Sequence, residues 1–267
     1  MDTFALIKIL ILAAVAFIVT MAWTPLLTNV LYRYKLGKQI RDEAAAPIFS
    51  KLHAKKSGTP TMGGLLIWVT TLVLATIFAY VWLFAPESAI GRLNFLTRSQ
   101  TLLPLGALVA SALVGLLDDY YNVRRIGPRG GGLRIRHRLA IYTAIAIVGA
   151  WWFFVKLGWD LIHVPFIGDF NIGWWYVPLF IFIIVATAFS VNEADGLDGL
   201  AGGVLLTSFG AYATIALLQG KNELAAFCAV IVGALLAFLW FNINPARFFM
   251  GDTGAMGLGV TLGVVAM

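Results

Sequence analysis

The sequence predicts an all-α integral membrane protein, a bundle of about eight transmembrane helices that forms a single domain over residues 1–267. The chain is 60% hydrophobic and only 12% charged, whereas an ordinary soluble domain is about 25% charged. Mean hydropathy is +0.88, and eight long stretches lack any charged residue. This composition excludes soluble, disordered and collagen-like proteins, and the single cysteine, Cys228, excludes a disulfide framework.

A membrane-spanning helix needs roughly 20 mostly apolar residues. The first uncharged stretch, 9–32, is too long for the apolar part of a signal peptide and a basic segment follows it, so we expect a retained helix. Six further stretches are long enough to cross a bilayer, or nearly so: 57–86, 99–117, 139–155, 170–192, 199–220 and 224–246. The eighth, 253–267, would reach only about 22 Å across a core of about 30 Å. It is therefore a partial helix or, as we favour, the point at which a truncated sequence loses its C-terminal helices.

Basic residues predict the orientation. The loops after the first, third, fifth and seventh helices hold 14 of the 19 Lys and Arg residues, and the other side holds 5. The positive-inside rule places those four loops in the cytoplasm and the N-terminus outside. The net charge of +6 then reflects cytoplasmic loops and gives no reason to expect nucleic-acid binding. Six arginines of the third loop are expected to face anionic headgroups, with one or two holding a diphosphate as the alternative: Arg124, Arg125, Arg129, Arg134, Arg136 and Arg138.

The same four loops also carry the motifs that are rich in Asp, Asn and Gly. The orientation predicted from the basic residues therefore places all of these motifs on one face of the membrane. Their acids lie at or near expected helix ends: Asp118, Asp119, Asp195, Asp198 and Asp252. A carboxylate buried there is unfavourable unless something neutralises it, and the sequence identifies no close basic partner. Hard oxygen ligands suit Mg²⁺ or Ca²⁺, and Mg²⁺ commonly takes one or two carboxylates plus phosphate and water. The sequence therefore predicts a Mg²⁺–phosphate site at the cytoplasmic interface.

Each segment also has a plainer interpretation. An Asp-Asp pair at a helix end is typical of a solvated terminus. Asp195 and Asp198 share one face if their segment is helical, and otherwise belong to a turn with a capping role. Asp252 could simply cap the eighth helix, and Lys56 could be one more positive-inside residue. The stretch 58–64 either begins a helix with proline near its first position or offers backbone N–H groups to a phosphate.

Four segments of the sequence together resemble the polyprenyl-phosphate N-acetylhexosamine-1-phosphate transferase superfamily, and within it the phospho-N-acetylmuramoyl-pentapeptide transferases. The most specific is "KKSGTPTMGG", preceded by "IRDEAAAPIFSKLHA"; the others are "GLLDDYYNV", "NEADGLDGLAGG" and "FFMGDTGAMGLG". The sequence departs from the usual pattern at Asn122, where lysine is common, and at Glu193-Ala194, where the family usually has Leu-Thr.

The resemblance implies a reaction, a cofactor and site residues. The family transfers a phospho-sugar from a UDP-sugar, here UDP-MurNAc-pentapeptide, to undecaprenyl phosphate, releases UMP and needs Mg²⁺. It acts in the bacterial cytoplasmic membrane with its site facing the cytoplasm, as a homodimer. Asp252 is the implied Mg²⁺ ligand, and Asp118 and Asp119 are the catalytic pair close to the metal or the attacking phosphate. Positions lining the uridine–diphosphate pocket are Lys56, Thr61, Asn192, Asp195, Asp198, Asn242 and Phe249.

Two other functions stay open at this point. One is a sister enzyme that transfers N-acetylglucosamine-1-phosphate from UDP-N-acetylglucosamine to the same lipid, which a donor-specificity test separates. The other is a cation-coupled transporter, although transporters place their coupling acids near the bilayer midplane and these acids fall at helix ends.

Overall fold

The computed structural model describes residues 3–37, 58–97, 100–127, 131–164 and 167–267. Within these residues each uncharged stretch of the sequence forms one α-helix, in order. The helices are α1 (Thr3–Arg33), α3 (Leu65–Phe84), α4 (Leu102–Val123), α5 (Ile135–Trp151), α6 (Tyr176–Ala194), α7 (Leu200–Leu218), α8 (Asn222–Asn242) and α9 (Gly251–Ala266). Seven of the described helices are long and apolar enough to cross a membrane, and α9 is the short one. The helical polytopic fold is therefore confirmed.

Short elements lie between these helices. A 3₁₀ turn (Gly91–Leu93) precedes α4, and a π-helical turn (Trp152–Lys156) follows α5. Strand β1 (Leu161–Val164) pairs antiparallel with β2 (Gly168–Asn171), and a second 3₁₀ turn (Gly173–Trp175) leads into α6. The hairpin was not expected from the sequence, because its strands have only four residues each and lack a clear alternating pattern.

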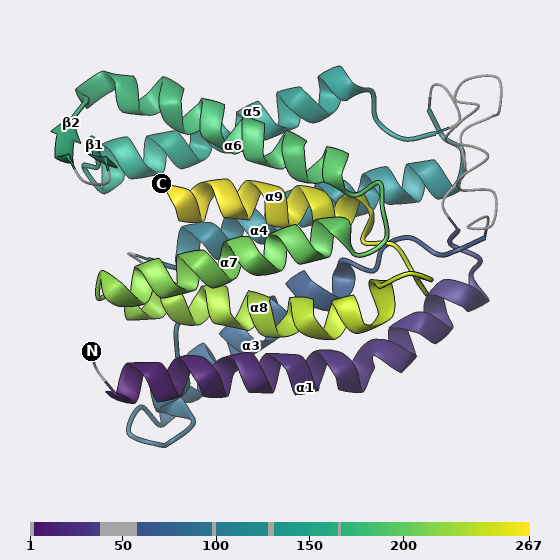
Figure 1. Ribbon diagram of the computed structural model, residues 1–267, viewed down its shortest axis with the longest axis horizontal. Coiled ribbons are helices and arrows are strands. Elements are labelled where there is room, and N and C mark those ends of the chain that lie inside the picture. The colour runs from purple at the N-terminus through teal and green to yellow at the C-terminus, as the bar shows by residue number, and fades with distance from the viewer. Residues whose placement is uncertain (1–2, 38–57, 98–99, 128–130, 165–166) are drawn as a thin grey trace.

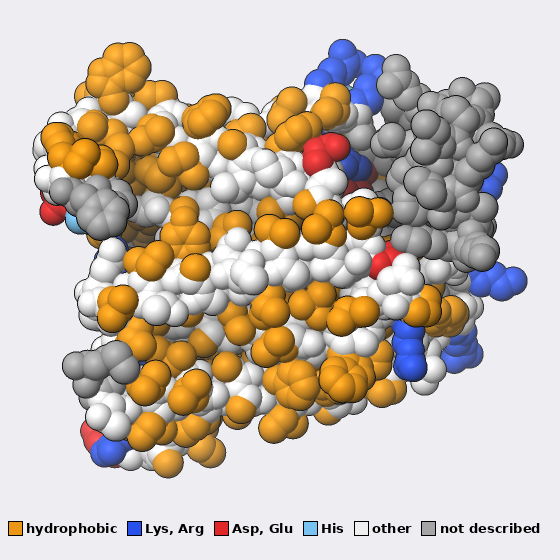
Figure 2. Space-filling view, in the orientation of Figure 1, with side chains coloured by type: hydrophobic (Ala, Val, Ile, Leu, Met, Phe, Trp, Pro, Cys, Tyr) orange, Lys and Arg blue, Asp and Glu red, His pale blue; other side chains and the backbone are white. Residues whose placement is uncertain are grey.

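The helices run side by side, and the motif-bearing segments meet at one end of the bundle. In Figure 1 the end of α4, the start of α5, the end of α6, the end of α8 and the start of α9 all lie at the right, while the marked N- and C-termini lie at the left. Charged side chains gather toward the two ends in Figure 2, and the long middle is orange and white. This is the distribution expected of a bundle whose sides face lipid.

Helix α9 is the centre of the bundle. Every residue from Gly251 to Val265 except Leu262 is buried, and α9 packs chiefly against α4 and α6 (Figure 1). Small residues allow this close approach, since without them the backbones of neighbouring helices could not meet. A Cβ on Gly64, for example, would overlap the backbone of Gly254. The core therefore lies around the helix that begins with the GDTG segment.

Gly115 gives a test of this packing. A Cβ at this position of α4 would overlap the carbonyl oxygen of Asp252, whereas a Cβ at Gly106 on the same helix would meet nothing within 4 Å. Gly115→Ala should destabilise the protein by about 1–3 kcal/mol through overpacking, and Gly106→Ala should be neutral or slightly stabilising, as alanine favours helix. Thermal unfolding of the purified variants in detergent measures the difference. Equal melting temperatures for the two variants would contradict the close approach of α4 and α9.

Candidate active site

The three acids expected at the centre of the site are buried. Asp118 and Asp119 lie near the end of α4 and are 0% and 1% exposed, and Asp252 lies in the first turn of α9 and is 6% exposed. The interpretation of the Asp-Asp pair as a solvated helix terminus is therefore wrong. The N-terminus of α9 favours a negative charge in its first turn because of the helix dipole, which helps to explain how Asp252 is tolerated there.

Arg138, in the first turn of α5, is the basic partner that sequence reasoning missed. Its Nη2 lies 2.6 Å from Oδ2 of Asp118 and 3.0 Å from Oδ2 of Asp252. Its Nη1 donates to Oδ1 of Asn192 at 2.9 Å, and Nδ2 of Asn192 donates to Oδ1 of Asp252 at 2.8 Å. Four side chains from α4, α5, α6 and α9 thus form one polar cluster, which we call the Arg138 cluster.

This finding corrects the expectation that the arginines of the third loop face the headgroups in the case of Arg138, and it leaves open the alternative that one or two of them hold a diphosphate. The other described arginines of that loop are exposed, namely Arg124, Arg125, Arg134 and Arg136. Arg138 differs because it directly borders the uncharged stretch 139–155. A basic residue at the edge of a helix turns either to the headgroups or into the bundle, and this position was the signal available in the sequence.

Asp119 ties three segments together. Its Oδ1 accepts a hydrogen bond from Oγ1 of Thr61 at 3.1 Å, and its Oδ2 accepts one from the backbone N–H of Thr253 at 3.0 Å. The Thr253 hydroxyl in turn donates to the carbonyl of Ala112 at 2.9 Å and accepts from Nε1 of Trp68 at 3.1 Å. The start of α9 is therefore fixed against α4, α3 and the segment before α3.

The segment 58–64 follows neither of the two interpretations offered by its sequence. The backbone N–H groups of Gly63 and Gly64 donate at 2.8 Å to the carbonyls of Phe249 and Met250, and the N–H of Phe249 donates to the carbonyl of Pro60. Those N–H groups are therefore engaged by protein rather than offered to a phosphate, and Pro60 lies well before the first residue of α3. The segment positions the loop that leads into α9.

A second set of contacts joins the turn between α6 and α7 to the loop between α8 and α9. Asp198 Oδ2 accepts from Nδ2 of Asn244 at 3.1 Å, and Asn242 accepts from the N–H of Gly199 at 3.0 Å and donates to the carbonyl of Phe248. Asp195 accepts from the N–H of Gly251 at 3.2 Å. Asp195 and Asp198 therefore belong to a turn, as one alternative held, but Gly199 occupies the N-cap of α7 without a side-chain cap.

The predicted site residues thus fall into neighbouring groups. The Arg138 cluster takes in three of them: Asp118, Asn192 and Asp252. Thr61 and Asp119 lie beside it through Thr253, and Asp195 adjoins it through Gly251. The loop contacts above hold Asp198 and Asn242, and Phe249 is half-buried between them and the segment 58–64. Lys56 lies outside the described residues.

The charges of the Arg138 cluster fit a divalent cation. Two carboxylates share one guanidinium, so the cluster carries a net charge of −1 while it is largely buried, which favours a further cation. No group of three or more His, Cys, Asp and Glu side chains in the described part of the chain is arranged to hold a metal. Two carboxylates nevertheless suffice for Mg²⁺ when phosphate and water complete its shell. Asp118 and Asp252 are the residues that would hold it.

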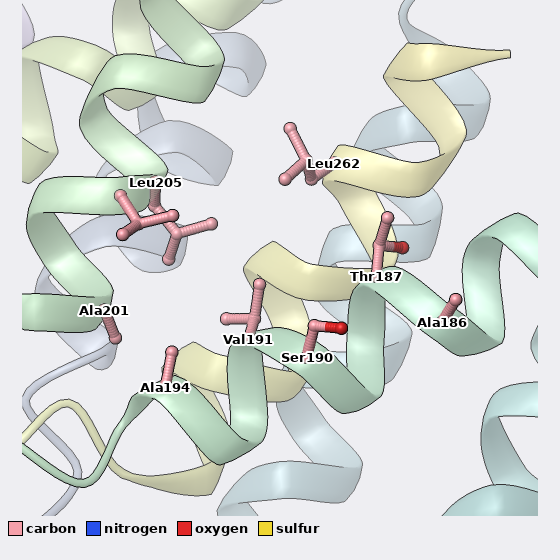
Figure 3. A pocket seen from close by; sticks show the side chains of 9 residues that line it. Ala186, Thr187, Ser190, Val191, Ala194, Ala201, Leu205 and Leu262 are labelled. Atoms are coloured by element: carbon pink, nitrogen blue, oxygen red, sulfur yellow. The ribbon is translucent and has the colours of Figure 1, made fainter.

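An apolar pocket lies beside the site, between α6, α7 and α9. It has a volume of about 250 Å³, and its walls include Val191, Ala194, Ala201, Leu205 and Leu262. In Figure 3, Ala194 and Ala201 flank the turn between α6 and α7, and Leu262 approaches from α9. The pocket therefore extends from the polar end of the bundle into its apolar middle.

Comparison with known proteins identifies the family of this chain. The family described as Glycosyl transferase family 4 matches residues 101–267, and phospho-N-acetylmuramoyl-pentapeptide-transferase signature 1 matches residues 56–67. The phospho-N-acetylmuramoyl-pentapeptide-transferase of Chloroflexus aggregans is 39% identical over 97% of this chain and 67% of its own length. Its namesakes from Bacillus anthracis and Geobacillus thermodenitrificans are each 38% identical over 97% of this chain and 74% of their own.

Proposed function

This chain belongs to glycosyl transferase family 4, among the phospho-N-acetylmuramoyl-pentapeptide transferases, and we propose that it makes the first lipid-linked precursor of peptidoglycan. It transfers phospho-N-acetylmuramoyl-pentapeptide from the UDP-linked donor to undecaprenyl phosphate and releases UMP. The observation that carries the proposal is the buried Arg138 cluster, in which carboxylates, a guanidinium and an amide converge at one end of a membrane bundle.

The reaction needs charge neutralisation more than a base. An oxygen of the acceptor phosphate bonds to the sugar-bearing phosphorus of the donor, the bond from that phosphorus to the bridging oxygen breaks, and UMP leaves. Phosphoryl transfer depends mainly on positioning and electrostatic stabilisation. The acceptor is a phosphate monoester with a second pKa of about 6, so it is mostly a dianion at pH 7. A general base therefore has little to remove.

Residues of the Arg138 cluster have distinct roles in this proposal. Asp118 and Asp252 hold Mg²⁺, which when bound neutralises charge on the diphosphate. Arg138 contacts the diphosphate as a second cation, and Asn192 keeps the carboxylate of Asp252 in place. Asp119 acts through its bonds to Thr61 and Thr253, which position the start of α9.

The location of the active site follows from the two proposed substrates. The donor is water-soluble and the acceptor is a membrane lipid, so a site at the end of a bundle is reached by both. We place that end at the cytoplasmic side of the bacterial inner membrane, because the loops there are rich in Lys and Arg. The homodimer implied by the resemblance stays a prediction.

Release of UMP tests the proposed function. The natural-length protein in detergent, with undecaprenyl phosphate and Mg²⁺, should release UMP with UDP-MurNAc-pentapeptide and not with UDP-N-acetylglucosamine. Release with the second donor alone would move the protein to the sister enzyme. Release with neither, together with ion-driven transport in vesicles, would revive the transporter. The position of the acids at one end of the bundle argues against that outcome.

The apolar pocket gives a separate test of acceptor binding. We propose that it takes part of the polyprenyl chain, because it lies at bilayer depth beside the site. Val204 lines it and is 47% exposed, so tryptophan there should fill the pocket without disturbing the core. Val204→Trp should raise KM for undecaprenyl phosphate about fivefold or more, through lost apolar burial, and leave KM for the UDP donor unchanged.

Thr207→Trp is the matched control, because Thr207 is an exposed residue of the same helix outside the pocket lining. Equal acceptor KM values for the two tryptophan variants would place the polyprenyl chain elsewhere.

A further inference from the structure

Three buried side-chain atoms in and beside the Arg138 cluster have no hydrogen-bond partner among the described residues. One is an acceptor, Oδ1 of Asn122, and two are donors, Nε of Arg138 and the hydroxyl of Tyr142. Beside them, Oδ2 of Asp118 has the ion pair with Arg138 as its one contact of this kind. Asn122 lies one helical turn beyond Asp118 on α4, and Tyr142 lies one turn beyond Arg138 on α5. Buried polar atoms are nearly always paired, so a group of unpaired ones marks a place where a partner arrives or a side chain moves.

Tyr142 lies on the side of the Arg138 cluster that faces the apolar interior of the bundle. Because α5 runs from the site end into the bundle, Tyr142 lies one turn deeper than Arg138, and it is 1% exposed. Its ring packs in the apolar cluster that also contains Ala107 and Met256. The charged groups near its hydroxyl include Arg138, Asp252 and Asp118. The side chain thus sits at the boundary between the polar site and the apolar core, with an unused donor on the polar side.

We propose that Tyr142 is a positioning residue of the transferase site, whose hydroxyl donates to Oδ2 of Asp118 when Mg²⁺ binds and Arg138 turns to the diphosphate. The inference rests on the proposed function. Arg138 now pairs with both carboxylates, and a metal ion bound to them would repel its guanidinium, while the diphosphate would attract it. Asp118 then keeps the N–H of Leu133 on Oδ1 but loses the donor beside Oδ2 at the moment when its orientation matters. A phenol replaces that donor without adding a positive charge that would compete with the metal.

The proposal makes an unusual prediction for Tyr142→Phe, which removes only the hydroxyl. In the structure without substrate that hydroxyl makes no hydrogen bond, so its loss should leave the melting temperature unchanged or slightly higher. The Mg²⁺-bound state, in contrast, should lose one hydrogen bond. A hydroxyl that merely supported the fold would give the opposite pattern, a lower melting temperature with unchanged metal affinity.

Tyr176 provides the matched control. It is the first residue of α6, at the opposite end of the bundle in Figure 1, and it is 0% exposed. Its hydroxyl is likewise buried without a partner among the described residues. Tyr176→Phe therefore makes the same chemical change in an equally buried setting, away from the Arg138 cluster.

The experiment measures the melting temperature of wild type, Tyr142→Phe and Tyr176→Phe in detergent with UMP and increasing MgCl₂, and then kcat and the KM values. Tyr142→Phe should need about 3- to 10-fold more Mg²⁺ for half of the full shift and lose a similar factor in kcat, as expected for one hydrogen bond, with KM for the lipid unchanged. Tyr176→Phe should match wild type.

Two results would overturn the inference alone, given a wild type that responds to Mg²⁺. One is a Tyr142→Phe protein with wild-type Mg²⁺ dependence and kcat, and the other is one with a lowered melting temperature and unchanged Mg²⁺ dependence. A wild-type protein whose melting temperature ignores Mg²⁺ would instead overturn the metal role in the proposed function, and this inference with it. UMP release by wild type separates that case from failure of the transferase assignment.

Discussion

Replacing Asp252 with asparagine should lower the rate of UMP release by about a thousandfold or more. Asparagine keeps the size of the side chain and an oxygen that accepts from Asn192, so the fold should persist. It removes the charge that would hold Mg²⁺ and that pairs with Arg138 at 3.0 Å. Losing one electrostatic contact to a reacting group slows enzymes by about 10²–10³-fold, and loss of a metal ligand adds to this. Initial rates with saturating substrates and Mg²⁺ measure the effect.

Asp169→Asn is the control for this substitution. Asp169 is an exposed acid on the hairpin, where it pairs with His163 at 2.7 Å, at the end of the bundle away from the Arg138 cluster. Its replacement should leave UMP release within a factor of two or so, since surface ion pairs contribute little. An Asp252→Asn protein that folds and retains a tenth of wild-type activity would remove Asp252 from the role of principal metal ligand.

Replacing Arg138 with glutamine should damage both activity and stability. The substitution leaves Asp118 and Asp252 buried beside each other without their shared cation. Breaking a buried ion pair by removing one partner destabilises proteins by about 3–5 kcal/mol, so the melting temperature without Mg²⁺ should fall clearly. UMP release should fall about 100-fold or more, because a cation that faces the diphosphate is lost.

Arg136→Gln is the matched control, because Arg136 is exposed and lies two residues earlier in the same helical turn. It should melt and react like wild type. Added Mg²⁺ should raise the melting temperature of Arg138→Gln more than that of wild type, since the metal no longer competes with the guanidinium for the same carboxylates. Equal melting temperatures for the two glutamine variants, or an equal response to Mg²⁺, would contradict the electrostatic role given to Arg138.

The helices could be predicted because a long uncharged stretch has few alternatives to a buried or lipid-facing helix. The site residues could be expected at one end because they occur in alternate loops. Their partners could not be predicted, because the contacts join residues far apart in sequence. The backbone pairing of Gly63 and Gly64 with Phe249 and Met250 is invisible in either segment alone.

Arg138 shows a different limit. Counting charges treats all arginines of a loop alike, although only the direction of each side chain decides whether it faces lipid headgroups or carboxylates. The surroundings of Tyr142 are harder still to predict, since the sequence of an apolar stretch does not indicate which groups a tyrosine hydroxyl within it lies beside. Both residues lie on the first turns of α5, where the polar end of the bundle meets its apolar middle.

The central place of α9 has a consequence for how the protein is made. Seven helices of the described chain precede it in synthesis, yet it fills the space between α4 and α6. Until α9 has been synthesised, Asp119 lacks its hydrogen bond from Thr253, and Arg138 can pair with Asp118 but not with Asp252. The earlier helices must therefore enter the bilayer in a loose arrangement that stays open to a late arrival.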